Sequence, residues 1–144
     1  MPASHGAWKI LWSLNPSEAL TVFERILLIT DGTVTDLLEA FAGEAISVVK
    51  LSQSIGHRNG DAHALDVLEH EHVLQRTVLL RGADSGTSFL YGDSVIVPER
   101  LPPALFEGLM ATGQTIGRLL ATYRLETFRE IVDVRFGAAA KHAE

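Results

Sequence analysis

The sequence predicts an α+β fold in which an antiparallel β-sheet is flanked by helices. Two helical segments come first, and from residue 70 onwards two stretches of alternating side chains enclose a short turn. Further helices and a final alternating stretch follow, and this order of elements is typical of the α+β class. The chain has 144 residues, of which 47% are hydrophobic and 21% are charged. It is therefore long enough to bury one core, and we expect a single domain over residues 1–144.

The first predicted helix spans residues 16–29. Asn15 is a good N-cap, and Pro16 suits the first helical position. Apolar residues recur at helical spacing on one face, namely Leu20, Phe23 and Leu27. The Asp-Gly pair at 31–32 is expected to end the helix, and residues 1–14 are expected to form a loosely ordered arm.

A second helix is predicted from Thr33, which makes a capping-box-like start with Asp36, and it ends before Gly43. Its apolar face consists of Val34, Leu37, Leu38 and Phe41. The stretch 45–51 is rich in β-branched residues and predicts a strand. Residues 53–66 contain Gly56, Asn59 and Gly60 with little apolar pattern, so they predict a loop.

Residues 70–97 predict a β-hairpin. Side chains alternate along the first strand, so that one face holds His72, Leu74, Arg76, Val78 and Leu80. The opposite face holds Val73, Gln75, Thr77 and Leu79. Residues 83–86 have the composition of a hairpin turn, and residues 89–97 form a matching antiparallel strand that ends at Pro98.

Three more elements are predicted after the hairpin. Short helices are expected over residues 104–110 and 116–123, separated by Gly113. Residues 128–136 alternate again and predict a last strand, although residues 124–129 could instead extend the preceding helix. Residues 137–144 are expected to form a tail.

Composition excludes several classes of function. There are 12 Lys and Arg against 18 Asp and Glu, a net charge of −6, so we expect no nucleic-acid partner. The chain has no cysteine, which excludes disulfides, thiolate nucleophiles and cysteine-ligated metals. No stretch approaches the roughly 18 apolar residues of a membrane span, and the N-terminus lacks the apolar core of a signal peptide. We therefore expect a cytoplasmic protein with no membrane partner.

Arg76 is the most informative single residue. It lies in the middle of a predicted strand, in phase with Leu74 and Val78 on an apolar face. A guanidinium in that position stays charged and needs a partner. An ion pair with an acidic residue, or a side chain whose head reaches water, would satisfy it. The functional alternative is a bidentate clamp for a substrate carboxylate.

A cluster of acids and histidines precedes this strand and raises the question of a metal site. Two histidines at i and i+2 of a strand point the same way, and imidazole is a zinc ligand. The cluster lies at a loop-to-strand junction, where charges are usually solvated, and no further ligand follows at a recognisable spacing. We expect no metal. Its members are Asp61, His63, Glu69, His70, Glu71 and His72.

The other motifs are weak evidence of a functional site when each is taken alone. The helix start at 31–33 could cradle an anion, but a helix-capping turn is the favoured explanation, and the glycines of 113–117 are equally weak evidence on their own. Ser85 and Ser88 lack the Gly-x-Ser-x-Gly pattern, so a hydrolase nucleophile is not supported. Three acids are expected to be surface charges that pair with Arg124 or Arg129. These acids are Glu126, Glu130 and Asp133.

Several segments, taken in order, resemble the chorismate lyase (chorismate–pyruvate lyase) family. They are RILLITDGTVTDLLEAF (25–41), LQRTVLLRG (74–82), YGDSVIVPERLP (91–102), TIGRLL (115–120) and LETFREI (125–131). The resemblance implies a chorismate lyase-like fold, an antiparallel sheet with flanking helices, which agrees with the elements predicted above.

The resemblance also implies an activity. It is the cofactor-free elimination of pyruvate from chorismate, a small carboxylated substrate of aromatic biosynthesis, to give 4-hydroxybenzoate or a related aromatic acid. Arg76 is then the catalytic, carboxylate-binding arginine. Val34, between Thr33 and Thr35 of the helix-start motif, lines the substrate site. Ile116 and Gly117 of the TIG segment line it as well.

Members of the family usually continue past the segment equivalent to FREIVDVRFG with two strands, the last of which carries a glutamate thought to assist proton transfer. Here AAAKHAE follows, so the chain is expected to be a C-terminally short member. An open sheet edge would invite pairing with a second copy, which predicts a homodimer. Two alternatives stay open: another reaction on a carboxylated biosynthetic intermediate, and non-enzymatic binding of a small molecule.

Overall fold

The computed structural model describes residues 20–30, 33–57 and 65–135. The predicted arm and helix start before residue 20, residues 58–64 of the predicted loop and the tail over 137–144 lie outside these ranges. Within them, no helix combines the length and the apolar composition that crossing a membrane requires.

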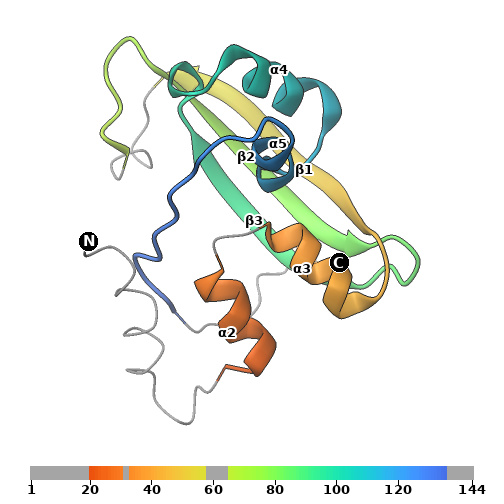
Figure 1. Cartoon of the computed structure of the whole chain (residues 1–144). Helices are drawn as coiled ribbons and strands as arrows, with labels where there is room; N and C mark the ends of the chain where they lie inside the picture. The colour runs from red at the N-terminus through yellow and green to blue at the C-terminus, as the bar shows by residue number, and fades with distance from the viewer. Residues whose placement is uncertain (1–19, 31–32, 58–64, 136–144) are drawn as a thin grey trace.

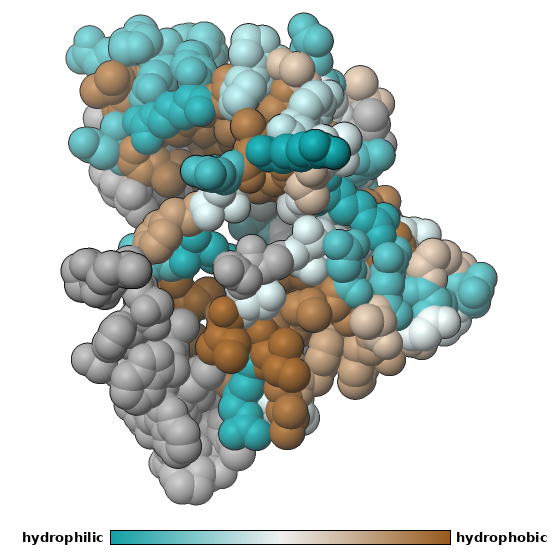
Figure 2. Space-filling view, viewed as in Figure 1, coloured by the Kyte–Doolittle hydropathy of each residue, from teal (hydrophilic) through white to brown (hydrophobic). Residues whose placement is uncertain are grey.

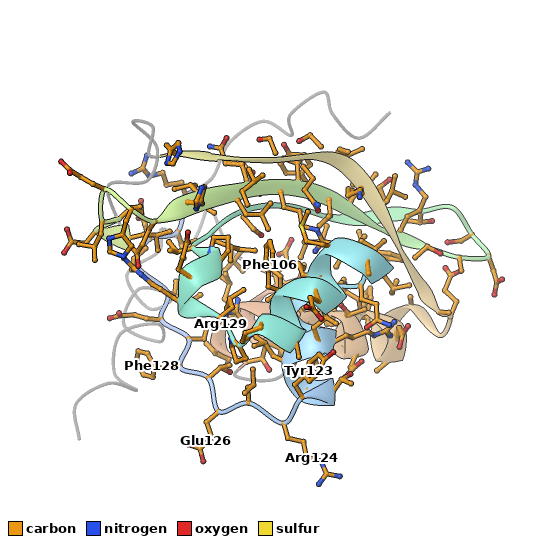
Figure 3. All side chains as sticks on the ribbon, turned by 90° about the horizontal axis from the view of Figure 1, so that it is seen from above. Phe106, Tyr123, Arg124, Glu126, Phe128 and Arg129 are labelled. Atoms are coloured by element: carbon orange, nitrogen blue, oxygen red, sulfur yellow. The ribbon has the colours of Figure 1, made fainter. Side chains whose placement is uncertain are left out.

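A three-stranded antiparallel sheet, in the order β1-β2-β3, forms the framework (Figure 1). Seen from above, the helices lie on one side of this sheet (Figure 3). The predicted α+β class, with helices flanking an antiparallel sheet, is confirmed. The elements are α2 (Val22–Ile29), α3 (Val34–Ala42), β1 (Ile46–His57), β2 (His72–Gly82), β3 (Ser88–Ile96), η4 (Pro98–Arg100), α4 (Pro103–Thr112) and α5 (Ile116–Thr122).

Helix α2 begins later than the sequence predicted. Residues 20 and 21 are not helical, and Thr21 is the N-cap. Its hydroxyl accepts the Glu24 N–H at 3.2 Å, while the Glu24 carboxylate accepts the Thr21 N–H at 2.7 Å. This reciprocal capping box satisfies two amides that a helix start leaves without partners, which fixes the start at Val22.

Strand β1 is longer than predicted, and the loop expected from residue 53 was wrong over 53–57. These residues pair with β2 as far as the His57–His72 pair. Pairing to a neighbouring strand here outweighs a weak local pattern. The register shifts between Lys50 and Ser52, so Leu51 is an extra residue, a β-bulge, on β1.

The hairpin of β2 and β3 follows the prediction closely. Gly86 adopts φ 70° in the turn, a conformation that glycine tolerates best. The carboxylate of Glu44 accepts the N–H groups of Asp84 at 2.7 Å and Ser85 at 2.8 Å. The turn is thereby fixed to the segment between α3 and β1.

The strand predicted over 128–136 was wrong, and so was the alternative of a longer helix over 124–129. Helix α5 ends at Thr122 with Tyr123 as its C-cap, and Arg124 has φ 52°. Residues 125–135, here called the strap, are neither helix nor strand. Their alternation fits an extended chain, but no strand of the described residues pairs with them. The side chains of Phe128 and Val132 are 70% and 84% exposed.

The inner face of the sheet carries two apolar clusters under the helices. Leu74 packs with Leu105, Leu109 and Leu119 of α4 and α5. Leu80 packs with Leu38 and Ile46 at the other end of the sheet. The predicted core face of β2 is therefore confirmed. Arg76 lies on that face between the two clusters and is itself buried.

Candidate functional site

A cavity of about 840 Å³ opens between the inner face of β2 and β3, the starts of α3 and α5, and the strap. Figure 2 shows the surface hollowed in the middle of this view, above the apolar side chains of α2. This volume suits a small organic molecule. The cavity is lined by Thr33, Val34, Thr35, Arg76, Val78, Leu80, Leu90, Gly92, Ser94, Thr115, Ile116, Gly117, Leu120, Ala121, Leu125, Thr127, Phe128, Arg129 and Glu130.

Every site residue predicted from the sequence lies on the wall of this cavity. Residues 33–35 come from the start of α3, Arg76 from the middle of β2, and residues 116–117 from the start of α5. Positions 33 and 117 are far apart in the sequence, and the fold brings them into contact. Their roles toward a substrate stay predictions.

The guanidinium of Arg76 is the dominant charge inside the cavity wall. The residue is 2% exposed. Its Nη2 donates to the backbone carbonyl of Gln114 at 2.8 Å, and no acidic side chain of the described residues forms an ion pair with it. Burial lowers the pKa of Arg76 from its ordinary value, but a guanidinium remains protonated at neutral pH.

The starts of α3 and α5 meet beside Arg76. The hydroxyl of Thr35 donates to that of Thr115 at 3.2 Å, and both residues are buried. Thr115 also caps α5, because its hydroxyl accepts the Arg118 N–H at 3.2 Å. A Cβ built on Gly117 would lie 3.2 Å from Thr33 Cγ2. Glycine therefore permits this close approach of the two helices.

Thr33 is the N-cap of α3, but its side chain makes no capping hydrogen bond. The capping box predicted for Thr33 and Asp36 was therefore wrong. Thr33 lines the cavity instead, and its neighbour Gly117 crowds it from the other helix. The first amides of α3 thus lack a side-chain acceptor from Thr33, at a helix end that favours negative charge.

The strap closes one side of the cavity and includes residues that the sequence reading missed. Arg129 Nη1 donates to the carbonyls of Thr30 at 2.8 Å and Leu27 at 3.3 Å, at the C-terminal end of α2. Glu130 is exposed, as a predicted surface charge should be, and it also lines the cavity. Figure 3 shows Arg124 and Glu126 pointing away from the helices. Asp133 pairs with Arg135, so its predicted pairing with Arg124 or Arg129 was wrong.

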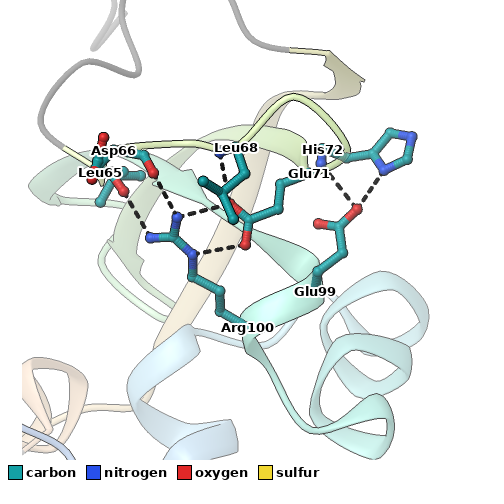
Figure 4. A network of polar contacts seen from close by, with 7 residues as sticks. All are labelled: Leu65, Asp66, Leu68, Glu71, His72, Glu99 and Arg100. Carbon is teal, nitrogen blue, oxygen red and sulfur yellow. Dashed lines mark hydrogen bonds and ion pairs between the residues drawn. The ribbon is translucent and has the colours of Figure 1, made fainter.

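The candidate metal ligands form an ion-pair network instead (Figure 4). Glu71 accepts from Arg100 Nη2 at 2.7 Å and Nε at 3.1 Å, and these bonds lower its pKa to about 2. His72 Nδ1 contacts the Glu99 carboxylate at 2.5 Å. Within residues 20–30, 33–57 and 65–135, no group of three histidines or acids could hold a metal ion. Asp61 and His63 lie outside these ranges.

Comparison with known proteins places the chain in a family. Residues 28–144 match the family model described as chorismate pyruvate-lyase Rv2949c-like. The chain belongs to this family. The match includes the whole lining of the cavity.

Similar curated proteins carry the same description. The chorismate pyruvate-lyase of Mycobacterium leprae (strain TN) is 36% identical over 113 residues, which are 78% of this chain and 54% of that protein. The chorismate pyruvate-lyase of Mycobacterium tuberculosis (strain CDC 1551 / Oshkosh) is 31% identical over 116 residues, which are 78% of this chain and 58% of that protein. This chorismate pyruvate-lyase-like chain thus spans about half the length of the curated relatives it matches.

Proposed function

We propose that this chain eliminates pyruvate from chorismate and leaves 4-hydroxybenzoate. The observation that carries the proposal is Arg76, a fully charged side chain that is 2% exposed on a cavity wall without an acidic partner among the described residues. A buried charge of this kind is stabilised by an anion that enters from outside. The family and the names of its mycobacterial relatives favour chorismate as that anion.

The reaction requires little from the protein beyond the positioning of the substrate. The bond between the ring carbon and the ether oxygen breaks, a proton leaves the neighbouring ring carbon, and the ring becomes aromatic. The released enolpyruvyl group gains a proton and becomes pyruvate. Oxidation states balance within the substrate, so the step itself calls for no external oxidant or reductant. A site that holds the substrate in a reactive geometry therefore supplies much of the catalysis.

We assign the residues as follows. Arg76 binds a substrate carboxylate through paired hydrogen bonds. Thr33, Val34 and Thr35 present the start of α3 to the substrate, whose anionic groups are favoured there. Ile116 and Gly117 shape the opposite wall. These roles rest on the shared cavity lining and on the resemblance to chorismate lyases.

The test is a pyruvate-release assay with purified protein and chorismate. We expect release well above the rate in buffer alone, and Arg76→Ala should lose roughly 10²-fold or more of kcat/KM. The matched control is Arg124→Ala, which removes an arginine that points away from the cavity (Figure 3). Release at the buffer rate by the folded wild-type chain would end the proposal.

We also propose a cytoplasmic homodimer that forms along a sheet edge. Within the described residues β1 and β3 are the edges of the sheet. Leu51 and Ile55 on β1 are 44% and 51% exposed, and Tyr91 on β3 is 43% exposed. Open edges with apolar side chains invite pairing with a second copy. Sedimentation equilibrium that shows a monomer at all concentrations would contradict the dimer.

A further inference from the structure

Gln53 of β1 lies directly opposite Arg76 of β2 in the register of the sheet. Each of the two side chains buries one polar atom that has no hydrogen-bond partner in the described part of the chain, Oε1 of Gln53 and Nε of Arg76. One atom is an acceptor and the other is a donor. Residues that face each other in an antiparallel pair have Cβ atoms about 5 Å apart, within reach of two long side chains.

The bulge at Leu51 creates this juxtaposition. Before it, Val48 lies opposite Leu80, and after it, Gln53 lies opposite Arg76. Without the extra residue in the pairing, Ser52 would lie opposite Arg76, and Gln53 would turn to the other face. Bulges often re-aim a side chain next to a functional site.

The Gln53 side chain lies on the same face as the helices. Its Nε2 donates to Sδ of Met110 in α4 at 3.2 Å, and α4 packs on the inner face through Leu105 and Leu109. The donor end of the amide is therefore used on the helix side, which leaves Oε1 as the end that can serve Arg76. A guanidinium offers donors only, so it requires this orientation of the amide.

We propose that Gln53 is the positioning residue of Arg76: its Oε1 accepts a hydrogen bond from one water, which in turn accepts the Arg76 Nε–H. With Nε held by Gln53 and Nη2 by Gln114, one edge of the guanidinium is fixed to the protein. The end of the fork, with Nη1 and the second hydrogen of Nη2, then faces a substrate carboxylate. This inference rests on the proposed function only for the identity of that carboxylate.

The neutral charge of Gln53 suits this position better than the negative charge of a glutamate would. A glutamate at 53 would hold the guanidinium equally well, but it would neutralise the charge that the substrate needs. An amide can orient the guanidinium of Arg76 without neutralising its positive charge, which stays available to the substrate. Glutamine is thus suited to orient Arg76 without competing with the ligand.

The first readout is independent of activity. The Nε–H resonance of Arg76 in ¹⁵N-labelled protein, assigned by its loss in Arg76→Lys, should exchange slowly with water in the wild type. In Gln53→Leu we expect faster exchange and a changed shift. Gln75→Leu is the matched control, because Gln75 directly precedes Arg76 in β2 and faces the other side of the sheet. An unchanged Arg76 signal in folded Gln53→Leu would overturn the proposal.

The second readout is binding and turnover with the same variants. Gln53→Leu should raise the Kd for 4-hydroxybenzoate and the KM for chorismate about tenfold, with a smaller effect on kcat. Gln53→Glu should restore slow Nε–H exchange yet keep the weak binding, because it neutralises Arg76. A purely structural role would instead leave Gln53→Glu binding the ligand normally. If the wild type neither binds nor turns over these compounds, the proposed function fails, while the exchange data still decide the role of Gln53.

Discussion

At the scale of single residues, the site depends on a positive charge held among apolar side chains. Arg76 lies between the cluster around Leu74 and the cluster around Leu80 on the inner face of the sheet. Desolvation of a charge is expensive, and in a dry site its attraction to a carboxylate is correspondingly strong. Under the proposed function, recognition of a carboxylated ligand would therefore follow from burial as much as from charge.

The Arg76→Lys variant tests whether activity needs the planar shape of the guanidinium as well as its positive charge. Lysine keeps a positive charge but loses the planar fork that a carboxylate engages with two parallel bonds. We expect kcat/KM for chorismate to fall about tenfold or more, less than in Arg76→Ala. Steady-state pyruvate release measures this. Equal activity of Arg76→Lys and wild type would show that the fork contributes nothing.

Arg76 and Gln53 differ in how readily the sequence identifies them. Alternation along β2 puts Arg76 on the core face, and its charge makes it conspicuous there. Gln53 falls in a stretch that the sequence assigns to a loop, and the bulge at Leu51 interrupts the alternation that would reveal its face. A bulge depends on pairing between strands, so local pattern does not reveal it.

At the scale of elements, the strap is joined to the rest of the fold by few polar contacts. Arg129 links it to the last carbonyls of α2, where a positive charge is favoured by the helix dipole. The cavity wall formed by Thr127, Phe128 and Glu130 depends on this anchor.

Arg129→Ala should loosen the strap with little loss of global stability. The lost hydrogen bonds are exposed, so the free energy of unfolding should fall by only about 1 kcal/mol. Chymotrypsin should cut after Phe128, which is 70% exposed, several-fold faster than in wild type. Arg124→Ala is the control. Equal cleavage rates in both variants would mean that Arg129 does not hold the strap.

The strap also shows why secondary structure cannot be predicted fully from the local sequence. Alternating side chains predict an extended backbone, but the strap is neither helix nor strand. Whether such a segment becomes a strand depends on a neighbour with free backbone groups, and no such neighbour pairs with it among the described residues. Glu130 is the surface charge that the sequence predicts, but its place on the cavity comes from contacts between distant parts of the chain, which a local pattern does not reveal.

At the scale of the whole molecule, the Glu71–Arg100 network fixes the segment before β2 to η4. Arg100 also donates to the carbonyls of Leu65 at 2.7 Å and Asp66 at 3.0 Å. Glu71 is 6% exposed, and its pKa falls from 4.5 to about 2, chiefly because of the hydrogen bonds from Arg100. A carboxyl whose pKa is lower in the folded state stabilises the fold above its unfolded pKa.

Glu71→Gln should therefore change how stability depends on pH. In wild type, this contribution is complete above about pH 4.5 and is lost as pH falls toward about 2. The variant should be less stable at neutral pH, with a flatter profile between these values. Urea unfolding at a series of pH values measures this, with Glu69→Gln as the exposed control. Parallel profiles for wild type and Glu71→Gln would contradict the assignment.

The cavity itself is a property of the whole molecule that the sequence indicates only through its parts. Each short motif, the start of α3 at Thr33 and the start of α5 at Ile116, is compatible with a simple capping turn. Their convergence with Arg76 depends on Gly117 allowing α5 to approach Thr33. The periodicity of the sequence identifies the helix starts and Arg76 separately, but only the packing of the fold brings them together on the cavity wall.

Because Arg76 is buried without an acidic partner in the described residues, folding alone gives no reason to keep it. Replacing a buried ion pair by apolar side chains of similar volume is often neutral or stabilising by about 1–4 kcal/mol, and a buried charge without an acidic partner has no Coulombic attraction to lose. A variant such as Arg76→Met should therefore melt at a higher temperature than wild type while it loses its ligand. If the proposed function holds, a gain in stability at this position would come at the expense of ligand binding, so the arginine would be explained by the ligand and not by folding.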